Sequence, residues 1–175
     1  MKIKNNFFVI SNYNNDLGWL SSYRNDYVIY DRSDSAEISE KITRSKIIKS
    51  PNVGFNLYDY LTFIINHYDN LPDCMIFIKG NVMPRHVSQE YFNKIINNTS
   101  FTPIIDRKMH GKTFWPISFF DKDGLFNEIN NSWYTKYFSK KYFSNYNDFL
   151  RLFYKNPGVH FYTKFAPGAN YIVPK

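Results

Sequence analysis

Three short polar runs, each directly after an apolar run, carry side chains that can bind a phosphorylated ligand. They are Asn12-Tyr13-Asn14, Asp31-Arg32-Ser33-Asp34 and Lys79-Gly80-Asn81. In an open parallel sheet, ligands lie beyond the carboxyl ends of the strands, where these polar groups are expected to meet. Any single Asn or Asp in such a loop more often satisfies its own backbone, so the prediction depends on all three runs meeting.

Acid/base chemistry has one local candidate, the pair Asp121 and Asp123 in the run 120–124. The alternative interpretation of this D-x-D pattern is a surface turn. The histidines are isolated in sequence, and His67 is expected to be structural. Cys74 lies inside an apolar run, which favours a buried inert thiol over a nucleophile.

The elements that must position these residues follow from the apolar pattern. Runs 7–11, 27–31 and 74–78 read as strands, and 74–78 has the continuous apolarity of a strand covered on both faces. Between them, a helix over 55–68 is predicted from apolar residues three and four apart: Leu57, Tyr60, Leu61, Ile64, Ile65 and Tyr68. Strand, helix and strand at this spacing predict parallel neighbours with their carboxyl ends at one edge.

The remaining pattern predicts smaller elements. They are a short helix after Asp16, a third short strand near Ile47-Ile48, helices over 89–97 and 147–154, and late strands over 159–164 and 171–173 around a Pro167-Gly168 turn. Residues 99–144 lose their period and predict loops and short strands. The fold class is therefore α/β: a single domain with a mostly parallel sheet flanked by helices and a loop-rich C-terminal half. The chain is expected to divide into the halves 1–98 and 99–175.

Composition agrees with one globular domain. The chain has 175 residues, of which 43% are hydrophobic and 20% aromatic, far too many for a disordered chain. No apolar run reaches the length that spans a bilayer, and the N-terminal run is too short for a signal peptide. With a single cysteine, these features predict a cytoplasmic protein without a transmembrane segment. Phosphate-loop, dinucleotide-fingerprint and serine-hydrolase motifs are missing, which disfavours those classes.

The formal charge of +7 is compatible with a second function class. Basic charge with many aromatic residues is typical of proteins that bind single-stranded nucleic acid, but it also suits any protein that handles a phosphorylated ligand. Heavy use of Asn, Lys, Ile, Tyr and Phe is also what an AT-rich genome would produce. Nucleic acid is therefore the disfavoured partner.

The order of the polar runs resembles the nucleotide-sugar-binding half of family 2 glycosyltransferases, which have the GT-A fold. The matching residues are Tyr13-Asn14, Asp31 to Asp34, and the N-x-G-F turn at Asn52-Val53-Gly54-Phe55. The resemblance implies a nucleotide-sugar donor bound by the half 1–98 and a glycan or other hydroxyl acceptor on the half 99–175. In that carry-over the ring of Tyr13 stacks on the nucleobase, and the carboxylate of Asp31 accepts a charge-assisted hydrogen bond from the base imide. It also implies a Mn or Mg ion held by a D-x-D, but this chain has Lys79-Gly80-Asn81 at that position. Fixed cations such as Lys79, Arg85 or Lys122 would then have to neutralise the diphosphate.

More of the chain resembles a family of uncharacterised bacterial, fungal and viral proteins, classed as a domain of unknown function. The matching stretches are 13–20, 51–61, 67–80 and 168–173. The family tends to have charged residues after the N-x-G, where this chain has Phe55-Asn56.

The end of the chain leaves alternatives open for the general base. In family 2 enzymes the base usually follows a helix that comes after a turn and strand like 168–173, and this sequence stops at Lys175. The base then comes from Asp121 or Asp123, or the sequence is a piece of a longer polypeptide, or the domain binds without reacting. The sugar, the stereochemistry and the oligomeric state are not encoded in any pattern.

Overall fold

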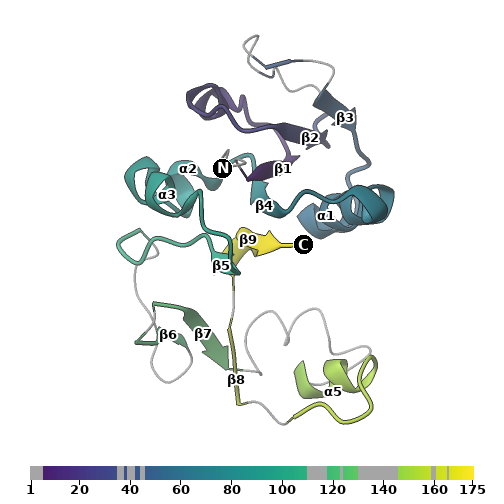
Figure 1. The fold of residues 1–175 in the computed structure, drawn as a ribbon, viewed down its shortest axis with the longest axis vertical. Coiled ribbons are helices and arrows are strands. Elements are labelled where there is room, and N and C mark those ends of the chain that lie inside the picture. The colour runs from purple at the N-terminus through teal and green to yellow at the C-terminus, as the bar shows by residue number, and fades with distance from the viewer. Residues whose placement is uncertain are drawn as a thin grey trace. The chain divides into compact units, whose positions relative to one another are not determined.

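A computed structural model describes residues 6–34, 38, 42–43, 46–109, 118–122, 124–129, 146–158, 161–164 and 166–175. The chain forms two compact units, Met1–His110 with Ala166–Lys175, and Gly111–Phe165 (Figure 1).

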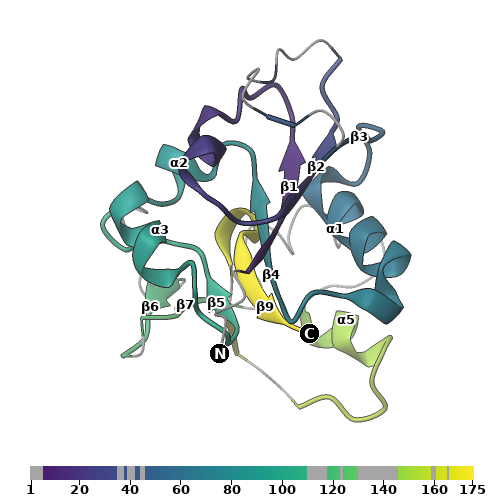
Figure 2. The same cartoon turned by 45° about the horizontal axis from the view of Figure 1, so that its top comes forward.

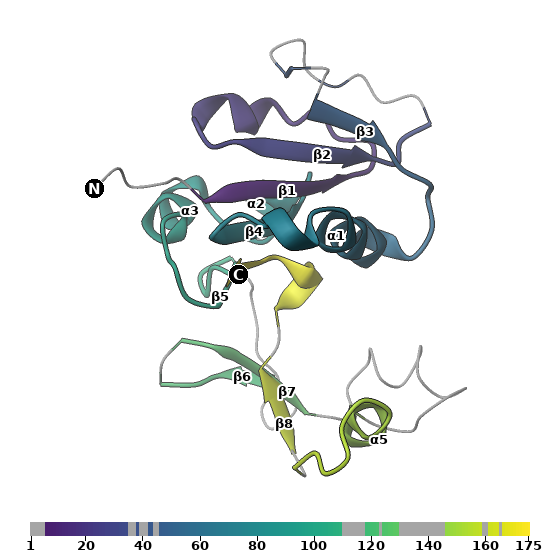
Figure 3. The same cartoon turned by 45° about the vertical axis from the view of Figure 1, so that its right-hand side comes forward.

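The first unit contains a six-stranded, mostly parallel sheet in the order β3-β2-β1-β4-β9-β5. The strands are β1 (Phe7–Asn12), β2 (Tyr27–Asp31), β3 (Ile47–Lys49), β4 (Cys74–Lys79), β5 (Thr102–Pro103) and β9 (Tyr171–Pro174). β1 pairs in parallel with both β2 and β4, and β2 with β3, whereas β9 runs antiparallel to β4 and β5. Figure 3 shows β1, β2 and β3 running in the same direction. The predicted mixed α/β class and the three parallel neighbours are confirmed.

Helices cover both faces of this sheet (Figure 2). Helix α1 (Phe55–Asn66) lies on one face, and α2 (Val82–Arg85) and α3 (Gln89–Ile95) lie on the other, with the 3-10 turn η1 (Gly18–Ser22). Further 3-10 turns are η3 (Tyr68–Asn70) and η4 (Pro167–Ala169). Every residue of β4 from Cys74 to Ile78 is buried, as its continuous apolar run predicted.

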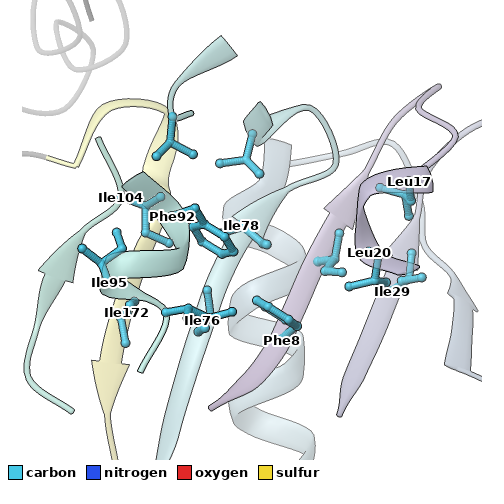
Figure 4. Packing of buried hydrophobic residues seen from close by; sticks show 14 of the residues in the cluster. Phe8, Leu17, Leu20, Ile29, Ile76, Ile78, Phe92, Ile95, Ile104 and Ile172 are labelled. Carbon is cyan, nitrogen blue, oxygen red and sulfur yellow. The ribbon is translucent and has the colours of Figure 1, made fainter. Parts of the chain in front are cut away.

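The sheet divides the core into two apolar clusters because successive strand residues point to opposite faces. The cluster under α3 and η1 contains Phe8, Ile10, Ile29, Ile76, Ile78 and Phe92, most of which are labelled in Figure 4. The cluster under α1 contains Val9, Tyr30, Tyr60, Phe63, Met75 and Phe77. This alternation also decides on which face each polar residue at the strand ends lies.

Helix α1 buries a different face from the one that its apolar pattern predicted. Its fully or nearly buried residues are Asn56, Asp59, Tyr60 and Phe63. Of the six apolar positions predicted to face the core, Leu57, Leu61, Ile65 and Tyr68 are 52%, 48%, 70% and 71% exposed. The buried positions do have helical spacing, but two of the four are polar. Hydrogen bonds inside the protein compensate those polar groups, so hydrophobicity alone selects the wrong face.

The second unit contains a three-stranded antiparallel sheet in the order β6-β7-β8. Its strands are β6 (Ser118–Phe120), β7 (Phe126–Ile129) and β8 (Tyr162–Lys164), and its helix is α5 (Tyr146–Arg151). The predicted helix over 147–154 and the late strand ending at 164 are therefore present with shifted boundaries. Within the described parts of the chain, no helix is both long and apolar enough to cross a membrane.

Candidate ligand-binding site

The polar residues predicted to meet at one edge of the sheet do meet there. Asn12 pairs in register with Asp31, and Ser11 pairs with Lys79, so the ends of β1, β2 and β4 lie side by side. Strand alternation nevertheless separates their side chains onto the two faces of the sheet. Asn12 and Asp31 follow the core residues Ile10 and Ile29 by two positions, so their side chains lie on the α3 side of the sheet. Ser11 likewise follows Val9 of the α1-side cluster.

On the α3 side, Asp31 is the centre of a hydrogen-bonded group that also contains Asn12 and Ser33. Its Oδ1 accepts hydrogen bonds from Asn12 Nδ2 at 3.1 Å and from Ser33 Oγ at 2.7 Å. The Ser33 N–H lies 3.3 Å from the same oxygen. All three residues are buried. The hydrogen-bonding capacity of Oδ1 is therefore filled by protein donors, and these bonds hold the loop after β2.

The second oxygen of Asp31 is differently placed. Among the described residues this oxygen has one ion-pair partner, Lys49 Nζ, at 3.9 Å. The Lys49 side chain is 66% exposed, and its ammonium also donates to the Ser33 carbonyl. Oδ2 thus remains available to accept a hydrogen bond from a ligand.

Tyr13 and Asn14 lie in the loop that follows β1. Tyr13 is 45% exposed, so its ring can be reached from solvent. Asn14 has a φ of 57°, and its N–H donates to Ser33 Oγ at 2.7 Å, which links this loop to the one after β2. A second asparagine, Asn15, donates to the Tyr13 carbonyl at 2.8 Å. The Tyr13 backbone is therefore held next to the Asp31 group.

Gly80 leaves space for this group at the end of β4. A Cβ at Gly80 would overlap Asn12 Oδ1 and lie 2.9 Å from Leu17 Cδ2, so no larger residue fits without displacement. Its carbonyl accepts a hydrogen bond from Trp19 Nε1 at 2.9 Å. Next to it, Asn81 Oδ1 is buried without a hydrogen-bond donor among the described residues.

On the α1 side, the carboxylate of Asp59 lies at the centre of a second group. Asp59 is fully buried and accepts hydrogen bonds from the hydroxyls of Ser11 and, at 2.6 Å, Ser50. Arg32 Nε lies 3.3 Å from Asp59 Oδ2. Burial raises the pKa of Asp59, while the two hydroxyls and Arg32 oppose that shift. The carboxylate thus connects α1 to the ends of β1 and β2.

Two cations of this group keep unused hydrogen-bond donors. The Arg32 side chain is only 10% exposed, yet its Nε makes no aligned hydrogen bond to any residue that the structure describes. Lys79 has no ion pair within the described chain either. Burial, followed by repulsion from Arg85 and Arg32, lowers the pKa of Lys79. Partly buried positive charge that the protein does not neutralise is an attractive environment for an anion.

The other predicted binding residues are Lys79, through its backbone, and Asp34, Asn52 and Gly54. The Lys79 N–H donates to the side chain of the fully buried Asn170 at 2.9 Å, which joins the end of β4 to the turn before β9. Asp34 and Asn52 are exposed. Gly54 precedes α1 with a φ of 62°, which glycine adopts without strain, so its observed role is to begin the helix.

The predicted acid/base pair belongs to the second unit. Asp121 Oδ1 accepts from the Leu125 N–H at 2.9 Å, and its Oδ2 accepts from Asn127 Nδ2 at 3.1 Å. These bonds stabilise the turn between β6 and β7, as the alternative interpretation expected. Asp123 lies outside the described residues. A catalytic role for either residue stays a prediction.

Sequence reasoning missed Ser11, Ser50, Asp59 and Asn170 as site residues, and it named Arg32 only as a member of the run 31–34. The available signal for Asp59 was its spacing from Asn56, Tyr60 and Phe63, which places all four on one side of a helix. The available signal for Arg32 was strand alternation, which separates it from Asp31. Neither signal identifies the partners, because Ser50 and Asp59 come from different elements.

Comparison with known families gives one result. The family model described as "Protein of unknown function (DUF3431)" matches residues 8–107, and the chain belongs to this family. That range includes the strand ends and the α1 residues of both polar groups, and excludes Asn170. No curated protein and no solved structure matches the chain.

Proposed function

We propose that this family member binds a nucleotide-sugar at the carboxyl edge of β1, β2 and β4 and transfers the sugar to a glycan or another hydroxyl acceptor. The observation that carries the proposal is the available Oδ2 of Asp31, whose loop is hydrogen-bonded to the loop that carries the accessible ring of Tyr13. A carboxylate oxygen selects a base edge that carries an N–H, such as the imide of uracil or guanine. The ring supplies stacking area for the base.

The position of the site agrees with general rules for open parallel sheets. Ligands in such folds bind beyond the carboxyl ends of the strands, where the loops diverge. Both polar groups lie at that edge, and one is cationic while the other presents a carboxylate oxygen. A ligand with a base at one end and phosphates in its middle has the complementary chemistry.

A non-catalytic nucleotide- or glycan-binding module on the same sheet is the second candidate. It is favoured by Asp121, both of whose carboxylate oxygens accept hydrogen bonds from its own turn. A general base must reach the acceptor hydroxyl directly or through one water. The two candidates share the nucleotide site and differ only in whether transfer follows binding.

Binding is tested by calorimetry with a panel of UDP-, GDP-, dTDP- and CMP-sugars, with a single-stranded oligonucleotide as competitor. We expect saturable binding of a uracil or guanine nucleotide-sugar. Binding of the oligonucleotide alone would instead assign the protein to the nucleic-acid binders. Release of free sugar from the bound donor then separates the enzyme from the module. If the predicted pair is catalytic, the double variant Asp121→Asn, Asp123→Asn should abolish that release while leaving donor binding unchanged.

The base contact is tested with Asp31→Asn. Asparagine can keep the oxygen that accepts from Asn12 and Ser33 and replaces the available oxygen with an NH2 donor. We expect the loss of about 1.5 to 3 kcal/mol of nucleotide affinity, the range for a charged hydrogen bond. The matched control is Asp26→Asn, an exposed change at the opposite end of β2. Equal affinity of Asp31→Asn and the native protein would contradict the assignment.

A further inference from the structure

We propose that Arg32 and Lys79 form a fixed-cation seat for a phosphate or diphosphate group, which takes the place of a divalent metal ion. The inference rests on the proposed function for the identity of the whole ligand, but the seat itself can be tested without it. Neither residue belongs to the Asp31 group that would hold the base.

Strand alternation brings the cations together. Lys79 follows Phe77 by two positions in β4, and Phe77 belongs to the α1-side cluster. Arg32 lies on that same side, because its guanidinium is beside Asp59 of α1. Ser11 of β1 lies between the two strands, paired with Lys79 and bonded to Asp59. The seat therefore spans the ends of three adjacent parallel strands.

The guanidinium of Arg32 is held in place from one side only. Its side chain is nine-tenths buried, and Asp59 Oδ2 at 3.3 Å is its charged partner. Asp59 in turn is held by the hydroxyls of Ser11 and Ser50. The Arg32 Nε is buried without an aligned hydrogen-bond acceptor among the described residues. A guanidinium carries further N–H donors in a planar fork that matches phosphate oxygens.

The charge balance of the seat favours an anion. Asp59 offsets the charge of Arg32, whereas Lys79 has no carboxylate within ion-pair distance among the described residues. Repulsion between Lys79 and Arg32 is relieved when a phosphate binds between them. The Tyr30 hydroxyl is buried on this face without a hydrogen-bond partner among the described residues.

The same position does not fit a divalent cation. Oxygen ligands hold Mg²⁺ or Ca²⁺, and the end of β4 instead presents an ammonium group. Among the described residues there is no cluster of three carboxylate, imidazole or thiolate side chains that could hold a metal ion. Fixed positive charge can stabilise the same phosphate oxygens that a metal would contact.

The test uses inorganic pyrophosphate as the probe, titrated by calorimetry in EDTA without added metal. We expect saturable binding to the native protein, weakened about tenfold or more in Lys79→Gln. The matched control is Lys94→Gln, which removes an exposed lysine of α3 paired with Glu90. Binding should remain native in that control.

The outcomes separate this inference from the proposed function. Absence of pyrophosphate binding in EDTA, or equal binding to native and Lys79→Gln proteins, would overturn the cation seat even if nucleotide-sugars bind. Pyrophosphate binding with no gain from an attached nucleoside would keep the seat and reject the nucleotide site. Asp31→Asn is expected to bind pyrophosphate as the native protein does, because the base contact is not involved. Circular dichroism verifies that each variant is folded.

Discussion

The carboxylate of Asp59, in the middle of α1, lies 3.3 Å from the Nε of Arg32, which directly follows β2. Two hydroxyl groups complete its surroundings, one from the end of β1 and one from the residue after β3. A buried acid on a helix thus joins three strand ends at the edge where the ligand is proposed to bind. The ion pair is as much a part of the architecture as the apolar clusters.

Removal of this acid should destabilise the protein strongly. Asp59→Ala leaves the Arg32 charge buried without its partner, and we expect a loss of about 3 kcal/mol in the free energy of unfolding. Asp59→Asn keeps one acceptor oxygen and should lose less. Urea denaturation measures both. The control is Asp26→Ala, an exposed pair with Lys46 whose loss should cost about 1 kcal/mol or less. Similar losses for Asp59→Ala and the control would contradict the structural role.

Gly80 should not tolerate a side chain. In Gly80→Ala the new methyl group would overlap the side-chain oxygen Oδ1 of Asn12 and the Leu17 side chain. We therefore expect the free energy of unfolding to fall by about 1 to 3 kcal/mol because of strain. Gly18→Ala is the matched control, since its Cβ would meet only the Asp16 side chain at 3.4 Å. Thermal unfolding of the two variants gives the comparison. Equal melting temperatures would show that the carboxyl edge of the sheet has room for a side chain at Gly80.

Lys79→Met should stabilise the ligand-free protein. Burial and the nearby arginines lower the pKa of Lys79, so its charge opposes folding. Between that lowered pKa and the ordinary lysine value, the unfolded chain binds more protons, and native stability rises with pH. The advantage of Lys79→Met is therefore full below the lowered pKa and shrinks as pH rises through this window. Melting temperatures over roughly pH 6 to 10 test it. An advantage independent of pH would indicate lost strain instead of lost charge.

The buried face of α1 can be verified by substitution. Phe63→Ala removes a ring that is 2% exposed and packs against Phe7 and Phe77, so a loss of about 3 to 5 kcal/mol is expected. Ile65→Ala, at a position 70% exposed, should change the unfolding free energy by less than about 0.5 kcal/mol. A larger loss for Ile65→Ala than for Phe63→Ala would indicate that the face predicted from the apolar pattern is the buried one.

The sequence by itself determined the strands of the parallel sheet and the polar runs at their ends. Continuous apolar runs such as 74–78 have few alternatives to a covered strand, and parallel strands necessarily end at one edge. Asp31 and Lys79 were therefore predicted at the site from local pattern alone. Helix α1 was also predicted, because the spacing of its apolar residues, three and four apart, is a local pattern.

Only the tertiary structure decided which face of α1 is buried and which polar residues meet on each side of the sheet. Asp59 is buried because Ser11, Ser50 and Arg32, each from a different segment, satisfy its carboxylate. Such compensation is long-range, so no hydrophobic pattern along one helix contains it. The separation of Lys79 from Asp31 onto opposite faces likewise depends on strand register, and hydrogen bonds between strands set that register.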